Sequence, residues 1–561
     1  MLKFVKRCKK ELTIFLITSC IWAGIGISFA YILKFITGIV INNIVTKTWY
    51  IVGLPLLYLC LNTLFEFAFN YAEALLRTKV SSHLRNAIMN RILRETIEEK
   101  EEKGGAYYLS LLNNSVMEIE NEYMHGILMV IYQLFSLVFA LVATMIINPT
   151  LSCIIVFLCI LPAAVPKLLR RKLEQVNQSA MQSKVMYLNF LNDFMDGFLT
   201  IKVFGRLQEI KIFHSNLNVE TTKKIQFSAK WKRLSMMLSY GISNIIVVGG
   251  WVFGIIFILR GLVSFPELIA LTTLMNMIAG PFQIISEYYA RIVSGRAIVK
   301  DVIKFLDIPK KKEETDYKSL TPSICSIELK DVSVIKGELN ILNNINLIIN
   351  KGEKICLLGH SGSGKTSLLK SIMGITKIKN GHILLNGVCV EEKEGLIHPT
   401  FRFVSQNTTL FSTTIANNIS LFKDLPKPTL EKALYESTLG KWYENIGKCL
   451  EININRNNVN LSGGELRRID FARTLVEDAQ ALLFDEPTSG LDQFHAKKVM
   501  DSICSLKNCI VIVATHNLDV ENVCRFDSVY ILKEGLVVAH DTPKNILSNS
   551  YYLELKQGTL E

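Results

Sequence analysis

Two carboxylates stand side by side at the end of a short apolar run. Asp485 and Glu486 follow residues 481–484, which predict a buried strand. A carboxylate at a strand end can hold a magnesium ion, and a second one beside it can act on a water molecule. Upstream, the sequence LSGGE at 461–465 opens a predicted helix over 465–475, whose first N–H groups suit a phosphate. Together these residues predict metal-assisted phosphate chemistry.

A second phosphate-binding pattern lies earlier in the chain. A short apolar strand is expected at 354–358, and GHSGSGKT follows it at 359–366 before a predicted helix over 367–373. This is G-x-x-x-x-G-K-[ST] in the strand–loop–helix context that it requires, so a plain glycine-rich turn is the weaker interpretation. Lys365 would neutralise the β- and γ-phosphates, and the Thr366 hydroxyl would ligate magnesium. The expected phosphate-binding residues are Gly359, His360, Ser361, Gly362, Ser363, Gly364, Lys365, Thr366 and Ser367.

Two further polar residues follow predicted strands. Gln406 comes after the strand expected at 401–405, and His516 comes after the strand expected at 509–514. Taken alone, a glutamine at such a place is more often a surface side chain, and a lone histidine is more often structural. His516 nevertheless ends a strand downstream of Asp485, so we expect it to reach the γ-phosphate.

The composition indicates a membrane half and a soluble half. The chain has 561 residues, of which 50% are hydrophobic, and the apolar residues are concentrated before about residue 290. The net charge of +12 could indicate a nucleic-acid partner. Cytoplasmic loops of a membrane protein also collect Lys and Arg, and this is the simpler explanation. The 12 cysteines include no CxxC pair, which favours reduced core cysteines over disulfides or a zinc site.

Six apolar runs are long enough to cross a bilayer, which takes about 20 residues. They are residues 12–40, 49–70, 126–147, 150–167, 236–259 and 265–288. The first is about twice as long as the apolar part of a signal peptide, so we expect it to be retained.

The distribution of cations orients the predicted spans. Seven Lys and Arg lie in the connection 71–125 and 13 in 167–235, against none in 148–150 and one in 260–264. We therefore expect the two long connections and both termini to be cytoplasmic. The long connections carry helical patterning, and we expect helices that run out of the membrane with short docking helices at their tips.

A few polar residues lie inside the predicted spans, on one face of the second and one face of the sixth. They are Asn62, Glu66, Asn70, Asn276, Gln283 and Glu287. Polar groups within a bilayer face a bundle interior or a water-filled path, so these residues could line a cavity for cargo. Hydrogen bonding between helices is the alternative, and both interpretations stay open.

A charged segment containing two prolines, residues 309–322, marks a domain boundary. We expect a transmembrane domain over 1–308, a linker over 309–322 and a nucleotide-binding domain over 323–561.

Five motifs occur in the order in which the ABC transporter superfamily has them. They are GHSGSGKT at 359–366, Gln406, LSGGE at 461–465, ALLFDE at 481–486 and His516. Nearly the whole chain resembles a half-transporter of the type IV exporter fold. The resemblance implies a multidomain chain with an all-α six-helix transmembrane domain, followed by an α/β P-loop nucleotide-binding domain.

The resemblance also implies ATP and Mg²⁺ as cofactors and a role for each motif residue. Thr366, Asp485 and Gln406 would contact Mg²⁺. Glu486 would polarise the attacking water, which Gln406 would also touch, and His516 would steady the transition state.

The same resemblance implies that two copies share each nucleotide. Ser462, Gly463 and Gly464 would close on the γ-phosphate bound by the other subunit. Segments near 103–110 and 192–200 would hold the coupling helices. Since both Glu486 and His516 are present, a homodimer is favoured over a heterodimer.

Two departures from the family pattern stand out. Family members usually place an aromatic ring under the adenine, yet no Phe, Tyr or Trp occurs between Tyr317 and Phe401. The aligned position falls near Ile335 and Lys336, so adenine would pack on an aliphatic chain. The acidic run common before the signature is also missing from 452–460.

The function that these features favour is ATP-driven export of a peptide or another amphipathic or hydrophobic compound across the plasma membrane, by alternating access. An importer of the metal-chelate type, a lipid flippase, and a membrane-anchored ATPase that gates a channel or signals remain alternatives. No nucleic-acid partner is expected, and no leader-trimming protease module is expected before the first span.

Overall fold

The computed structural model describes the chain outside a set of short ranges. These are 43–47, 151, 155–163, 308–322, 337–338, 390–400, 407–408, 438–445, 455–462, 477–478 and 559–561. The chain divides into two compact units: the first contains Met1–Glu95 and Lys103–Pro309, and the second contains Thr96–Glu102 and Lys310–Glu561. The expected linker at 309–322 lies outside the described residues.

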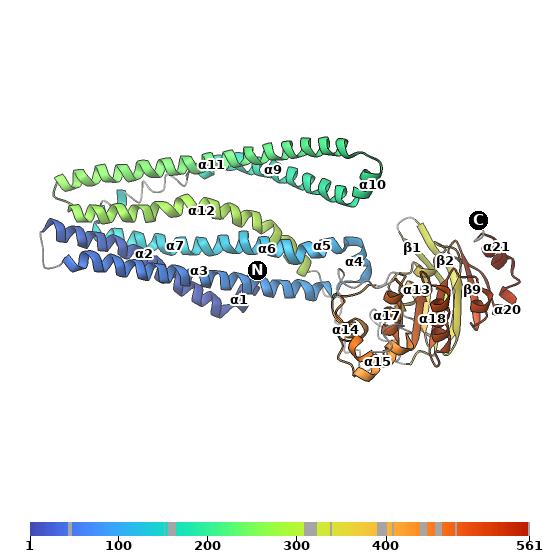
Figure 1. Cartoon of the computed structure of the whole chain (residues 1–561). Coiled ribbons are helices and arrows are strands. Elements are labelled where there is room, and N and C mark those ends of the chain that lie inside the picture. The colour runs from blue at the N-terminus through green and yellow to red at the C-terminus, as the bar shows by residue number, and fades with distance from the viewer. Residues whose placement is uncertain are drawn as a thin grey trace. The chain divides into compact units, whose positions relative to one another are not determined.

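The first unit is built from long helices that lie lengthwise beside one another (Figure 1). They are α2 (Lys9–Ile41), α3 (Thr48–Ile92), α7 (His125–Ile147), α9 (Ala164–Asp196), α11 (Leu207–Leu259) and α12 (Phe265–Leu306), and the short helix α1 (Leu2–Arg7) precedes them. Helices suit a bilayer because every backbone hydrogen bond is made within the segment. Ser264 and Glu267 form a capping box that starts α12, with the Glu267 carboxylate accepting from the Ser264 N–H at 3.0 Å.

Four described helical runs are long and apolar enough to cross a membrane. They are α2, α3, the run Gly105–Ile147 that ends in α7, and α11. They correspond to the first, second, third and fifth expected spans. The fourth expected span, 150–167, falls largely outside the described residues, and 265–288 forms the first part of α12.

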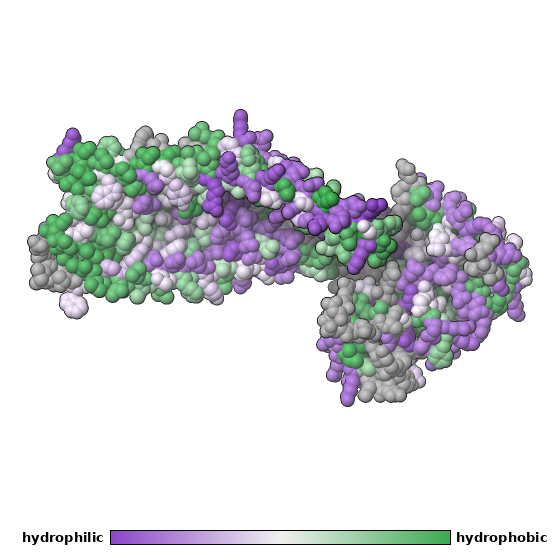
Figure 2. All heavy atoms as spheres, turned by 45° about the horizontal axis from the view of Figure 1, so that its top comes forward, coloured by the Kyte–Doolittle hydropathy of each residue, from purple (hydrophilic) through white to green (hydrophobic). Residues whose placement is uncertain are grey.

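The two long connections are helical, as expected. Between α3 and α7 the chain forms α4 (Ile97–Lys103), α5 (Gly105–Ser110), a π-helical segment η2 (Leu111–Ser115), α6 (Val116–Glu118) and a second one, η3 (Ile119–Met124). Between α9 and α11 it forms α10 (Phe198–Val203). Figure 2 shows hydrophobic residues covering the end of the first unit near the α11–α12 turn, while hydrophilic residues increase toward α10.

The core of the first unit lies where α2, α3, α7 and α12 meet. Phe15, Phe69, Leu76, Leu84 and Phe305 are buried there in one cluster. Trp22 stacks on Tyr132 at a centroid distance of 4.5 Å, and its indole N–H donates to Asn62 at 3.2 Å.

The second unit contains a six-stranded sheet in the order β10-β9-β3-β8-β7-β6. The strands are β3 (Lys354–Leu358), β6 (Phe401–Val404), β7 (Ala481–Asp485), β8 (Ile510–Thr515), β9 (Ser528–Lys533) and β10 (Leu536–Asp541). All neighbours pair in parallel except β9 and β10. Residues of β8 alternate between two buried clusters, with Ile510 and Ile512 in one and Val511 and Val513 in the other. Both faces of the sheet are therefore covered, which explains why its strands are almost wholly apolar.

A four-stranded antiparallel sheet in the order β2-β1-β4-β5 lies in the same unit. Its strands are β1 (Ser326–Lys336), β2 (Leu339–Asn350), β4 (Asn380–Leu385) and β5 (Val388–Cys389). The helices of this unit are α13 (Lys365–Ile372), α14 (Ile415–Ser420), α15 (Lys427–Glu436), α16 (Ile446–Cys449), α17 (Gly463–Leu475), α18 (Gln493–Ser505), α19 (Val520–Val523), α20 (Pro543–Ile546) and α21 (Ser550–Gly558). Because β3, β6, β7 and β8 run in parallel, the loops after them gather at one edge of the larger sheet.

Candidate functional site

The loop from β3 to α13 requires glycine at several positions. A Cβ on Gly359 would lie 2.4 Å from the carbonyl oxygen of Leu532 and 2.6 Å from Ser363 Oγ, so a larger residue does not fit. Gly362 and Gly364 have φ values of +82° and +102°, which side chains rarely adopt. The loop is thus held close to the end of the sheet, with its backbone free to face a ligand.

Lys365 begins α13, and its side chain lies inside this loop. The residue is 6% exposed, and Nζ donates to the carbonyl oxygens of Gly359 at 2.7 Å and His360 at 2.8 Å. Burial lowers the pKa of Lys365, while the nearby Glu486 and Asp485 carboxylates oppose that shift. The loop therefore encloses a cation that can turn toward an anionic ligand.

Ser363 supplies a second sign that this loop is suited to a ligand. Its hydroxyl oxygen is buried and has no hydrogen-bond partner among the described residues. Such a group is costly unless something satisfies it. A phosphate oxygen held by the loop would do so, and the glycine loop, the buried cation and this hydroxyl together fit a nucleotide phosphate.

Thr366 and Asp485 come together at the edge of the sheet, as their expected metal roles require. The Thr366 hydroxyl donates to Asp485 Oδ2 at 2.8 Å, and Asp485 is 3% exposed at the end of β7. Burial raises the pKa of Asp485, and the hydrogen bond from Thr366 opposes this shift. Among the described residues no group of three or more His, Cys, Asp and Glu could hold a metal alone. An ion here would need further oxygens from phosphates or water, as Mg²⁺ usually does.

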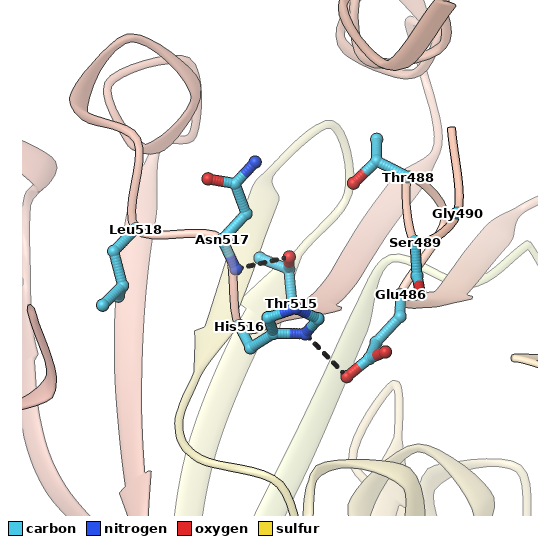
Figure 3. Close-up of a pocket in the computed structure, with 8 residues that line it drawn as sticks. All are labelled: Glu486, Thr488, Ser489, Gly490, Thr515, His516, Asn517 and Leu518. Atoms are coloured by element: carbon cyan, nitrogen blue, oxygen red, sulfur yellow. Dashed lines mark hydrogen bonds and ion pairs between the residues drawn. The ribbon is translucent and has the colours of Figure 1, made fainter. Parts of the chain in front are cut away.

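Glu486 is held from both sides by the other two predicted residues. Gln406 Nε2 donates to Oε2 at 2.9 Å, and His516 Nδ1 lies 2.9 Å from Oε1 (Figure 3). The backbone of Glu486 has φ +52°, and its N–H donates to the Ala514 carbonyl of β8 at 2.8 Å. Gln406, Glu486 and His516 follow β6, β7 and β8, so three neighbouring strands place one polar group each.

A depression of about 450 Å³ opens beside Glu486. Figure 3 shows the His516 ring directed toward the Glu486 carboxylate, with Ser489 and Gly490 above Glu486 and across from Asn517 and Leu518. The Glu486 side chain is 13% exposed and that of His516 is 57% exposed. A carboxylate that is oriented by hydrogen bonds and still open to solvent can polarise a water molecule.

The residues predicted for the signature and for adenine packing lie away from Glu486 in the sequence, near the start of α17 and on β1. Ser462 lies outside the described residues, while Gly463 and Gly464 begin α17. Ile335 lies half-buried in β1 and pairs with Asn340.

The polar residues of the expected spans differ in their surroundings among the described side chains. Asn62 bonds Trp22, while Glu66, Asn70 and Asn276 are exposed. Glu287 is exposed and pairs with Arg291 at 3.0 Å. Gln283 lies in α12, but its side chain is outside the described part of the chain.

Sequence reasoning missed one residue at this site, Arg467 of α17. Its guanidinium donates to the backbone carbonyl oxygens of Glu486 and Gln406. The only sequence signal was its position one helical turn after Gly463.

Fold and motifs together define an ABC transporter with its membrane and nucleotide-binding regions in one chain. The family model "ABC transporter transmembrane region" matches residues 12–282, and the model "ABC transporter" matches residues 342–489. The chain belongs to this superfamily. Its fold class is confirmed as a helical membrane domain followed by an α/β nucleotide-binding domain.

The individual relatives share about a quarter to a third of their residues with this chain over the aligned regions. An "ATP-dependent lipid A-core flippase" of Francisella tularensis subsp. holarctica (strain OSU18) is 32% identical over 288 residues, which is 50% of this chain and 46% of the relative. A flippase of the same name from Pseudomonas fluorescens (strain Pf0-1) is 24% identical over 508 residues, covering 88% and 82%. The chain thus spans about half the length of the first relative and most of the second.

A solved structure of a bacterial Atm1-family ABC exporter with ATP bound superimposes with a TM-score of 0.80. The match covers 99% of this chain and 98% of that one at 16% identity. This likeness supports the type IV exporter fold expected from the sequence.

Proposed function

We propose that this chain is one half of an ATP-driven exporter that hydrolyses ATP to move an amphipathic molecule across the membrane. The observation that carries this proposal is the set of groups at one edge of the sheet. A buried lysine and a hydroxyl–carboxylate pair lie beside a second carboxylate that a glutamine and a histidine orient. These groups stand at the ends of the four parallel strands β3, β6, β7 and β8. Each has a use in phosphoryl transfer to water.

The residues divide the chemistry among them. The loop 359–366 would bind the phosphates through its N–H groups and Lys365. Thr366 and Asp485 would hold Mg²⁺, which would neutralise charge on the phosphates. Glu486 would accept a proton from the attacking water, while Gln406 and His516 hold its carboxylate in place.

The proposed assembly contains two such chains, as a homodimer. The start of α17, which carries Gly463 and Gly464, would contact the nucleotide held by the other copy. The chain would lie in the plasma membrane with its termini and second unit in the cytoplasm, because the cations collect in the long connections.

The cargo that the relatives support is a lipid. The sequence alone favours peptide export by a small margin. Relatives in Francisella and Pseudomonas, however, are named lipid A-core flippases, so we place a lipid-like amphiphile first. Glu66, Asn70 and Asn276 remain exposed in the single chain. Exposed polar groups in a span need water or a partner, which supports a cavity lined by these residues.

Transport assays in vesicles with the second unit facing outward test the proposal. The probes are a lipid A-core preparation, an amphipathic peptide and a hydrophobic cationic dye. Export predicts ATP-dependent accumulation of one probe inside the vesicle. Loss from the lumen would indicate import, and ATP hydrolysis without net transport would indicate a gate or a signalling ATPase.

Two sets of variants test which residues are needed for ATP hydrolysis and which for transport. Glu486→Gln should retain ATP binding and abolish both hydrolysis and accumulation, while Glu554→Gln, at an exposed ion pair with Lys533, should change neither. Normal hydrolysis by Glu486→Gln would refute the role given to that carboxylate. If Glu66→Gln left transport and substrate-stimulated hydrolysis unchanged, the cavity assignment would be wrong.

A further inference from the structure

Arg467 joins the two loops that carry the proposed catalytic side chains. Its Nη1 donates to the backbone carbonyl of Glu486 at 3.0 Å, and its Nη2 donates to the backbone carbonyl of Gln406 at 3.3 Å. The side chains of those two residues also bond each other, Gln406 Nε2 to Glu486 Oε2, at 2.9 Å. Arg467, Glu486 and Gln406 thus form a closed ring of three contacts.

The Glu486 peptide depends on such contacts because its conformation is unfavourable. A non-glycine residue at φ +52° is held there by its surroundings. On one side its N–H is bound to the Ala514 carbonyl of β8. On the other side its carbonyl accepts from Arg467 and, at 3.2 Å, from the Ser489 N–H. Loss of the guanidinium would leave the carbonyl with only the weaker, uncharged contact and free the carboxylate to turn.

The guanidinium suits this role for two reasons. It is always charged and presents its donors as a rigid fork, so it can hold two carbonyls at a fixed separation. It is also partly buried, and burial lowers the pKa of Arg467 while Glu486 opposes the shift. Its neighbour Arg468 has a different orientation, since Nε donates to the Gly464 carbonyl of its own helix.

The position of Arg467 on α17 also connects the contacts among Arg467, Glu486 and Gln406 to the start of that helix. Gly463 begins α17, and Arg467 follows one turn later on the same side of the helix. In the proposed dimer, the start of α17 faces the nucleotide of the partner subunit. Movement of α17 on contact with that nucleotide would therefore move the carbonyls of Glu486 and Gln406 in its own chain.

We propose that Arg467 is a positioning residue that transmits engagement of α17 at one nucleotide site to the orientation of Glu486 at the other. This inference rests on the proposed function, because it requires two shared nucleotide sites. It makes hydrolysis at each site depend on the state of the other through one side chain.

Steady-state hydrolysis of the Arg467 variants tests the positioning role. Arg467→Met should lower kcat by ~10-fold or more, since a charged hydrogen bond is lost, with KM for ATP within ~3-fold because the phosphate loop is intact. The Hill coefficient for ATP should fall toward 1. Arg467→Lys keeps the charge and loses the fork, so it should restore part of kcat. Retention of kcat and cooperativity by Arg467→Met would overturn the inference, as would a change confined to KM.

Mixed dimers locate the effect within one chain. Two differently tagged chains are co-expressed, and one carries Glu486→Gln, so that only the other keeps a competent carboxylate. Arg467→Met should cause a larger loss in the chain with the intact Glu486 than in the chain with Glu486→Gln. Equal losses in both arrangements would overturn the inference. Failure of the proposed function is distinguishable, because the unmodified chain would then show no ATP-dependent transport.

Discussion

At the scale of one residue, burial of the Asp485 carboxylate lowers the stability of the folded protein but places a charged group where a metal ion could bind. Its carboxylate is buried at the end of β7, where it accepts a hydrogen bond from the Thr366 hydroxyl. A carboxylate in such a place is costly without a cation, which is why the pKa of Asp485 is raised by burial. The folded protein therefore binds a proton here more tightly than the unfolded chain does. This contribution to stability is present at low pH and is lost as the pH rises through the folded-state pKa.

We expect Asp485→Asn to stabilise the nucleotide-free protein at neutral pH by roughly 0.5–2 kcal/mol, because the uncharged amide keeps the Thr366 contact without the cost of burying a charge. The same variant should lose magnesium-dependent ATP hydrolysis. Thermal unfolding without nucleotide measures the first effect, and Asp424→Asn at an exposed position is the control. A lower melting temperature for Asp485→Asn would contradict the argument.

Base selectivity is a second question at the residue scale. Ile335 stands near the position where an aromatic ring is expected, and a stacked ring pair is worth about 0.5–1.5 kcal/mol. We expect the KM values for ATP and GTP to differ by less than ~3-fold. Ile335→Tyr should lower KM for ATP by ~2- to 10-fold, with kcat unchanged. A strong preference for ATP in the unmodified chain would show that other contacts select the base.

At the scale of elements, the sequence predicted most of the polar groups that stand at the ends of the parallel strands. The strand–loop–helix around Lys365 and the carboxylate Glu486 were expected because each comes after an apolar strand with a clear pattern. Gln406 and His516 also follow apolar strands, but their catalytic roles were expected from the family resemblance. Arg467 was not expected, since a side chain that bonds backbone carbonyls has no complementary residue in the sequence. The membrane polar residues were grouped by helical spacing alone. Spacing predicts a shared face, but it does not say which side chains bond a neighbour, as Asn62 does with Trp22.

Glu95 links the ends of the segment that contains α4, and nothing in the sequence predicted this role. It lies just after α3, and its side chain is 2% exposed. It accepts from Lys103 at 2.8 Å and from the Tyr108 hydroxyl, with Arg91 3.8 Å away. Burial alone would raise the pKa of Glu95, but these partners lower it. The pair of Glu95 and Lys103 fixes both ends of the short segment that contains α4.

Replacing Glu95 by Gln should destabilise the protein by about 1.5–3 kcal/mol, because the buried Glu95 would lose its charged hydrogen bond with the partly exposed Lys103 and its ion pair with Arg91. The wild-type contribution is lost as the pH falls through the lowered pKa of Glu95, so the difference between the two proteins should shrink in acid. Glu220→Gln at an exposed pair with Lys224 is the matched control, with an expected change below about 0.5 kcal/mol. Thermal unfolding in detergent at several pH values measures both. Equal effects of the two variants would contradict the assigned role of Glu95.

At the scale of the whole molecule, the proposal requires two chains for each catalytic cycle. Closed two-fold pairs are the commonest oligomers, and the groups that would contact one nucleotide belong to different copies. A monomer with full activity would refute this arrangement.

The rate of ATP hydrolysis by mixtures of active and inactive chains shows how many active copies each assembly needs. Lys365→Met removes the cation of the phosphate loop and should be inactive. If both sites are needed, an equal mixture of co-expressed wild-type and Lys365→Met chains should keep roughly one quarter of the hydrolysis, against about one half for independent chains. Lys351→Met at an exposed turn is the control and should leave the rate unchanged. A linear dependence on the wild-type fraction would contradict the shared-site proposal.

The buried hydroxyl of Ser363 has a consequence for the stability of the protein. No hydrogen-bond partner for it lies among the described residues, so a phosphate that bonds this hydroxyl would stabilise the folded loop. Nucleotide then acts as part of the interior of the C-terminal half, and binding shifts the folding equilibrium by mass action. Chains supplied with nucleotide should therefore resist unfolding and proteolysis better than chains without it.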